Sequence, residues 1–284
     1  MFKQQQGHKE VAMSRHDVTD AEWNAMRVFF PKARSGKRGR PWADHRKTLN
    51  GILWLIYVGS PWRDIPTEYG KWQTIYGRFR RWCREGVWDR IWNNLLKRID
   101  RDGVLDRNLW CVDGTIVRAH VSAVGGSSKT SRNAGQNALG RSRGGFATKL
   151  HVVCDGNGIP LAVLPTAGNI NEPTQFIKLM EEIPLSLHRK QKRPNAVAGD
   201  KAYVAGYIFK WIDDRGIENV IPNRKNENKN PKFCKRKYKQ RNVVERLIGK
   251  LKLHRRIATR YDKTVESYLA IIKIACLRIT LNTI

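Results

Sequence analysis

Three acidic residues, Asp113, Asp200 and Glu245, occupy positions from which carboxylates could hold metal ions. Cleavage of a phosphodiester by two Mg²⁺ ions needs carboxylates that keep the metals about 4 Å apart, one ion activating the attacking oxygen and the other stabilising the leaving oxygen. Each acid also has a structural explanation. Asp113 precedes Gly114, as a turn residue can, and Asp200 can cap the segment after it. Glu245 can pair with Arg241 in a salt bridge.

The segment 238–252, YKQRNVVERLIGKLK, is predicted to form one amphipathic helix around Glu245. At about 3.6 residues per turn, its polar residues fall on one narrow stripe and its apolar residues on the opposite face, as a helix packed on a core requires. The stripe consists of Tyr238, Arg241, Glu245 and Lys252. For this helix in isolation, a solvated face of salt-bridged charges is the simpler explanation. The outcome depends on whether the rest of the chain supplies further carboxylates.

Two short predicted strands end at the other acids. The apolar run 109–112 leads to Asp113, and the run 196–199 leads to Asp200. Between them, residues 147–154 and 159–164 are predicted to form a hairpin around a turn that begins at Asp155, which we expect at the surface. The predicted order is strand, hairpin, helix, strand, helix, strand, helix, helix. This α/β pattern brings strand-end carboxylates together where sites in such sheets are built.

Residues 17–104 are rich in Trp and are predicted to form a compact helical domain, with helices over 44–57 and 71–84. Helix, turn and then a basic helix is the layout of a helix-turn-helix reader, in which Gln73, Arg78 and Arg81 remain available to solvent for DNA contacts. A plain helical bundle with a basic exterior fits nearly as well. The loop 32–41, KARSGKRGRP, could place Arg38 and Arg40 in a DNA minor groove, or it could be a flexible basic linker.

The composition indicates a polyanionic partner. The 284 residues, enough for two domains, include 54 Lys and Arg against 25 Asp and Glu, a net charge of +29. Nucleic acid is the usual partner at such a charge, with ribosomal or membrane-surface binding as the competing explanation. Five scattered cysteines without a C-x-x-C pair are typical of reduced thiols in a cytosolic protein. We expect no signal peptide, membrane span or ATP-binding loop.

With these residues in view, the sequence resembles the DDE transposases of bacterial insertion sequences, specifically the insertion sequence five group. Its Y-x₂-R-x₃-E-x₆-K signature matches from Tyr238 to Lys252. The segments LWCVDGT, GRSRGGFATKLH and AGDKAY are similar to the family's blocks around the first two acids. LNGILWLIYVGSPWRDIP and KWQTIYGRFRRW are similar to its helical DNA-binding domain, so the resemblance covers nearly the whole chain.

The resemblance implies a ribonuclease H-like catalytic domain at 105–284, with a mixed five-stranded sheet and a mobile basic loop at 121–146. An all-helical DNA-binding domain at 17–104 and a flexible segment at 1–16 would precede it. Asp113, Asp200 and Glu245 would form the metal-bound catalytic triad, and Tyr238, Arg241 and Lys252 would contact transposon-end DNA.

The expected activity is that of a DNA transposase. It would bind the terminal inverted repeats of its element, cut DNA with Mg²⁺ (or Mn²⁺ as a substitute) and join the freed 3′-hydroxyl to target DNA. We expect double-stranded DNA as partner, a homodimer or higher oligomer on DNA, no nucleotide cofactor, and a cytoplasmic location at the bacterial nucleoid. The alternatives are a catalytically inactive DNA-binding descendant and a nuclease on the same fold.

Overall fold

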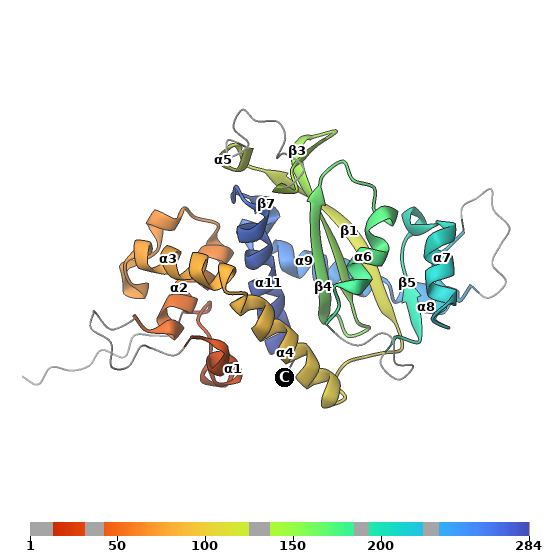
Figure 1. Ribbon diagram of the computed structural model, residues 1–284, viewed down its shortest axis with the longest axis horizontal. Helices are drawn as coiled ribbons and strands as arrows, with labels where there is room; N and C mark the ends of the chain where they lie inside the picture. The colour runs from red at the N-terminus through yellow and green to blue at the C-terminus, as the bar shows by residue number, and fades with distance from the viewer. Residues whose placement is uncertain (1–13, 32–42, 125–136, 185–192, 224–232, 284) are drawn as a thin grey trace, which may run out of the picture.

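The computed structural model describes residues 14–31, 43–124, 137–184, 193–223 and 233–283 (Figure 1). The N-terminal region is helical, as predicted. Its α-helices are α1 (Asp20–Met26), α2 (His45–Val58), α3 (Trp72–Arg84) and α4 (Val87–Arg101), with 3₁₀ turns η1 (Arg27–Phe29), η2 (Trp62–Asp64) and η3 (Thr67–Tyr69).

The helix ends in this region follow from local sequence. Thr19 forms a capping box with Glu22 at the start of α1, and the Asp44 carboxylate accepts hydrogen bonds from two backbone N–H groups at the start of α2. Gly59 ends α2 with φ 78°, a left-handed conformation that glycine adopts without strain. Aromatic side chains then pack edge to face between the helices, with the ring centroids of Trp82 and Trp88 5.5 Å apart.

The second region is a mixed sheet with a five-stranded core in the order β4–β3–β1–β5–β6. Strands β1 and β4 run antiparallel to β3, whereas β5 is parallel to β1 and β6 is parallel to β5. Two short strands, β2 and β7, extend it. The bounds are β1 (Trp110–Ala119), β2 (Gly140–Ser142), β3 (Gly145–Cys154), β4 (Pro160–Ala167), β5 (Ala196–Ala198), β6 (Glu218–Val220) and β7 (Thr259–Arg260). The α/β layout and the hairpin at 147–164 are confirmed.

Helices cover this sheet and join it to the N-terminal region. They are α5 (Val121–Val124), α6 (Phe176–Glu181), α7 (Gly206–Asp213), α8 (Lys235–Lys239), α9 (Asn242–Lys252), α10 (Arg255–Ala258) and α11 (Val265–Leu281), with 3₁₀ turns η5 (Pro173–Gln175) and η7 (Lys201–Tyr203). Figure 1 shows α11 between α4 and the sheet, and it packs on both α4 and β4. The two regions therefore share one apolar core. Among the described residues, no helix is both long and apolar enough to cross a bilayer.

The single helix predicted over 238–252 is wrong in one respect, because the chain breaks between α8 and α9. Tyr238 lies on α8, while Glu245 and Lys252 lie on α9. At the junction, the Arg241 N–H donates to the Tyr238 carbonyl (3.0 Å), a tighter turn than an α-helix makes. Buried apolar residues begin only at Val243, so packing stabilises the helix from that point onward.

The predicted loop at 121–146 has structured ends. Residues 121–124 form α5, and β2 pairs with the start of β3. Leu139 is buried, and the Thr148 hydroxyl donates to the Ala138 carbonyl (2.6 Å). The expectation of a loop throughout is therefore wrong at both ends, because β3 supplies an edge on which 140–142 can pair. Residues 125–136 of this segment lie outside the described residues.

Asp155 is buried, contrary to the surface position expected of a turn residue. Its carboxylate accepts hydrogen bonds from the backbone N–H groups of Asp106 (2.9 Å), Asn157 (3.0 Å) and Ile159 (2.7 Å). The first of these bonds comes from the chain entering β1, so the hairpin turn is packed against that segment. Burial raises the pKa of Asp155 to about 6, although its backbone hydrogen bonds oppose the rise.

We expect Asp155→Ala to lower the free energy of unfolding by about 1–3 kcal/mol, because it leaves buried N–H groups without acceptors. The folded Asp155 carboxyl holds its proton more tightly than the unfolded one, whose pKa is near the ordinary 3.8. Its contribution to folding stability is therefore present below that value and is lost as the pH rises through about 6, and the variant should lack this slope. Urea unfolding at several pH values measures both effects.

The control is Asp213→Ala, at an exposed position at the end of α7. It should change the free energy of unfolding by no more than about 0.5 kcal/mol. Equal stability of the two variants would show that the Asp155 contacts do not support the hairpin.

Candidate metal centre

Asp113 and Asp200 come together through the pairing of two parallel strands. Cys111 on β1 is in register with Ala198 on β5, and each acid follows its strand partner by two residues. Because alternate residues along a strand share a face, both carboxylates project to the same side at the same level. Carboxylate oxygens of Asp113, Asp200 and a third acid, Glu172, all lie within 4.8 Å of one another.

Glu172 is a third acid of this group that the sequence analysis does not name as a site residue. It is the cap residue of the 3₁₀ turn η5 and makes no side-chain cap bond. Its carboxylate is paired with Lys149 of β3 (3.2 Å). Glu172 lies on a connection after β4 rather than at a predicted strand end. The sequence signal for Glu172 as a site residue is limited to its place in the chain, shortly after the hairpin's second strand.

Backbone N–H groups orient the two aspartates. The Gly114 N–H donates to Asp113 Oδ1 (2.8 Å), and the Ala202 N–H donates to Asp200 Oδ1 (2.9 Å). Burial raises the pKa of Asp113, and the nearby charge of Asp200 adds to this, whereas Gly114 and Arg241 lower it. A nearby cation stabilises a carboxylate whose ionised form is disfavoured by burial.

Glu245 is outside the group of three and reaches it through Arg241. The guanidinium donates to Asp113 Oδ2 through Nη1 (3.0 Å) and to Glu245 Oε1 through Nη2. Arg241 has only 15% of its side chain exposed, whereas Glu245 has 53%. Asp113 therefore has Asp200 and Glu172 on one side and the Arg241–Glu245 pair on the other.

The remaining signature residues lie beside this centre. Lys252 donates to the Thr115 hydroxyl (2.7 Å), two residues beyond Asp113 on β1. Tyr238 packs its ring against Phe233 (5.5 Å) and lies under the Arg241 guanidinium (5.8 Å). The signature thus lines one side of β1, even though α8 and α9 are separate helices.

The helical region's predicted DNA-contact residues differ in their exposure to solvent. Gln73 and Arg81 are exposed on α3. Arg78 is only 8% exposed, which corrects the expectation that it is available to solvent. It donates to the Ala43 carbonyl (3.2 Å) and to His45 Nδ1 (2.5 Å), because its position on α3 faces the start of α2. Arg38 and Arg40 lie outside the described residues.

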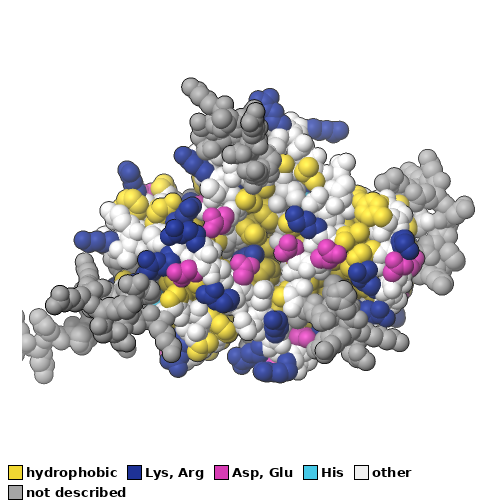
Figure 2. All heavy atoms as spheres, in the orientation of Figure 1, with side chains coloured by type: hydrophobic (Ala, Val, Ile, Leu, Met, Phe, Trp, Pro, Cys, Tyr) yellow, Lys and Arg dark blue, Asp and Glu magenta, His cyan; other side chains and the backbone are white. Residues whose placement is uncertain are grey.

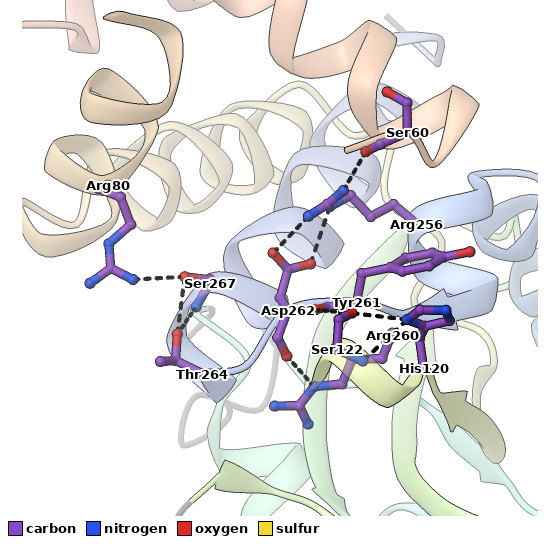
Figure 3. A network of polar contacts seen from close by, with 10 residues as sticks. All are labelled: Ser60, Arg80, His120, Ser122, Arg256, Arg260, Tyr261, Asp262, Thr264 and Ser267. Carbon is purple, nitrogen blue, oxygen red and sulfur yellow. Dashed lines mark hydrogen bonds and ion pairs between the residues drawn. The ribbon is translucent and has the colours of Figure 1, made fainter. Parts of the chain in front are cut away.

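A second feature is a cavity of about 800 Å³ at the junction of the helical region and the sheet. Its walls are aromatic and basic, and include Trp62, Trp72, Tyr76, Tyr261, Arg63, Arg80, Arg256 and Lys263. Figure 3 shows the polar network beside it, in which Arg256 pairs with Asp262 (3.2 Å) and also donates to the Ser60 carbonyl (2.7 Å). These contacts connect α10 to the end of α2. Figure 2 shows Lys and Arg side chains spread over the whole visible face of the molecule.

Comparison with known proteins agrees with this geometry. Residues 105–279, more than half of the chain, match the family model "Transposase DDE domain", and residues 18–92 match "Putative transposase of IS4/5 family (DUF4096)". The match to the DDE domain places the chain in the class of metal-dependent polynucleotidyl transferases and nucleases. The chain belongs to the DDE transposase family of insertion sequences.

Curated relatives support this membership. The chain is 36% identical over 154 residues to "Putative transposase for insertion sequence element IS402" of Burkholderia cepacia, covering 53% of this chain and 69% of that protein. It is 31% identical over 141 residues to "Putative transposase for insertion sequence element IS6501" of Brucella ovis, covering 48% of this chain and all of that protein. It is also 35% identical over 108 residues to "Uncharacterized protein y4sN" of Sinorhizobium fredii, covering 38% of this chain and 81% of that protein.

We expect Arg241→Met to raise the pKa of Asp113 further, because Arg241 is the nearby cation that opposes the effect of burial. The Asp113 carboxyl should then titrate at a higher pH than in the wild-type chain, which ¹³C NMR of labelled aspartate carboxyls would measure. Arg246→Met, one helical turn away and bonded to Asn242, is the matched control. An unchanged Asp113 titration in Arg241→Met would show that the guanidinium contributes nothing to the charge state of this centre.

Proposed function

We propose that this chain binds the terminal inverted repeats of an insertion sequence, cleaves DNA there, and joins the 3′-hydroxyl to target DNA. Asp113, Asp200 and Glu245 are its catalytic acids. The observation that carries the proposal is the meeting of Asp113 and Asp200 on neighbouring parallel strands, with Glu245 linked to Asp113 through one guanidinium.

The donor set fits a divalent metal. Carboxylate oxygens are the ligands that Mg²⁺ prefers, and Mn²⁺ accepts the same set. Asp113, Asp200 and Glu245 would be the residues that hold the metal. When bound, the ions supply activation of the attacking oxygen and stabilisation of the leaving oxygen.

The chain's own residues position these acids and the DNA backbone. Arg241 is a permanent cation that pairs with both Asp113 and Glu245 and favours the ionised form of Asp113. Lys252 is held over β1 by Thr115, where its ammonium can contact a phosphate near the acids. The Tyr238 ring packs against the Arg241 guanidinium, so that Tyr238 lies close to the proposed phosphate contacts.

The DNA surface extends to the helical region. Gln73 and Arg81 are exposed on α3, and the junction cavity offers aromatic faces and cations that suit bases and phosphates. Arg38 and Arg40 complete the set as minor-groove contacts, while Arg78 supports the position of α3. A net charge of +29 gives sequence-independent attraction to phosphates over the whole surface. The active form on DNA is a homodimer or higher oligomer, acting at the bacterial nucleoid.

Two other functions use the same fold. A DNA-binding descendant without activity would not nick DNA in the presence of Mg²⁺ or Mn²⁺. A nuclease would cleave the element's end without joining it to a second DNA. A strand-transfer assay with a labelled element end and a supercoiled target separates all three. A transposase gives joined products, a nuclease gives cleaved ends without joined products, and an inactive protein gives neither.

We expect Glu245→Ala to abolish strand cleavage while leaving affinity for the element's end largely intact, because it removes an acid and not a cation. Gel-shift and cleavage assays on one labelled end fragment measure the two properties. Asp213→Ala, which removes an exposed acid from α7, should cleave normally. Full cleavage by Glu245→Ala would sink the assignment of this acid.

We expect Lys252→Ala to weaken binding to all DNA sequences alike and to reduce the salt slope of the affinity by about 1, the value for one lost phosphate contact. Fluorescence anisotropy at several salt concentrations measures the slope. The control is Lys210→Ala, whose ammonium is 77% exposed on α7 and pairs with Asp214. If both variants have the wild-type slope, Lys252 does not contact phosphate.

A further inference from the structure

We propose that Glu172 is an additional ligand of the metal held by Asp113 and Asp200, supported by the hydroxyl of Tyr203. The inference rests on the proposed function, and it enlarges the centre from three carboxylates to four. Glu172 lies outside the Y-x₂-R-x₃-E-x₆-K signature and at the end of none of the predicted strands.

The first argument is the position of the Glu172 carboxylate. Its oxygen lies within 4.8 Å of oxygens from both aspartates, which is close enough for one ion to bind all three. The backbone leaves room for this approach, since a Cβ added to Gly114 would lie 2.8 Å from Glu172 Cδ. A glycine directly after Asp113 therefore lets the Glu172 side chain lie against β1.

The second argument is the balance of charge. Among the residues that the structure describes, two cations pair with the four carboxylates of Asp113, Glu172, Asp200 and Glu245: Lys149 with Glu172, and Arg241 with both Asp113 and Glu245. Within the described part of the chain, no ion pair to Asp200 is present. Carboxylate oxygens of three of these residues, Asp113, Glu172 and Asp200, lie within 4.8 Å of one another, and a divalent cation bound between them would offset their repulsion.

The third argument is independent of the acids. Tyr203 is fully buried, and in the described structure no group lies within hydrogen-bond distance of its hydroxyl. The Tyr203 backbone N–H donates to the Asp200 carbonyl (3.1 Å), and its ring packs against Phe176 (6.0 Å), so Tyr203 lies between the segments that carry Asp200 and Glu172. A buried donor without a partner calls for a ligand, and a metal-bound water or a carboxylate rearranged by the metal would supply the acceptor.

A purely structural role for Glu172 makes a different prediction. In that case its function is the ion pair with Lys149, which fixes the connection after β4 to the middle of β3. Glu172→Gln and Lys149→Met both break this pair, but only Glu172→Gln removes the anionic ligand. The two variants therefore separate metal binding from packing, and neither changes the shape of the side chain greatly.

The experiment uses the full chain with Mn²⁺ alone as probe, and measures free Mn²⁺ by electron paramagnetic resonance. The wild-type chain should bind Mn²⁺, and Asp113→Asn should lose this binding. Glu172→Gln should weaken the affinity at least about tenfold. Lys149→Met should bind as tightly as the wild-type chain or more tightly, because it removes a competing cation. Tyr203→Phe should weaken binding by less than Glu172→Gln does.

The outcomes separate the inference from the proposed function. If Asp113→Asn loses Mn²⁺ while Glu172→Gln binds it like the wild-type chain, Glu172 is not a ligand and the proposed function stands. If Glu172→Gln and Lys149→Met weaken binding equally, the role of Glu172 is structural and the inference is overturned. If the wild-type chain binds Mn²⁺ no better than Asp113→Asn, both proposals fail. Should Glu172→Gln not fold, Glu172→Asp keeps the charge with a shorter reach and should bind with intermediate affinity.

Discussion

The parallel pairing of β1 with β5 is the contact on which the metal centre depends. It is short, with Trp110 opposite Val197 and Cys111 opposite Ala198. All three residues of β5 are fully buried, and β6 pairs with the strand's other edge, so the position of β5 is determined from both sides. A slip of one residue would turn Asp200 to the opposite face of the sheet and separate it from Asp113.

This geometry places negatively charged carboxylates close together, and the surrounding residues offset part of their repulsion. Backbone N–H groups at Gly114 and Ala202 satisfy one oxygen of each aspartate, and Arg241 neutralises part of the charge on Asp113. Burial still raises the pKa of Asp113. The centre therefore favours a cation, and Arg241 both stabilises the unliganded arrangement and holds Glu245 within reach of Asp113.

The helical region and the sheet are coupled through the C-terminal helix. Helix α11 packs on α4 on one side and on β4 on the other, while Arg256 of α10 donates to the carbonyl of Ser60 after α2. A division of function into DNA recognition and catalysis thus does not require two independent cores. The shared core also fixes the position of α3 relative to the strand that carries Asp113.

Much of the architecture follows from local sequence. The hairpin turn and the alternation of strands and helices were predicted, and the caps Thr19 and Asp44 obey the same local rules, because capping, turn formation and amphipathic packing depend on residues close together in the chain. Asp113 and Asp200 were predicted to meet because both would end strands; Asp200 does follow the end of β5, whereas Asp113 lies inside β1, which continues to Ala119. The spacing from Tyr238 to Lys252 likewise identifies the family from sequence.

Tertiary structure alone decided four features. Glu172 joins the aspartates because the connection after β4 passes over Gly114, and Asp155 is buried because the chain entering β1 packs on its turn. Arg78 faces α2, and the helix predicted from 238 breaks before Asn242. Each outcome depends on contacts between segments far apart in the sequence, for which residue type and spacing carry no signal. Periodicity predicts which face of an element is apolar, but packing determines what covers that face and which polar group is enclosed with it.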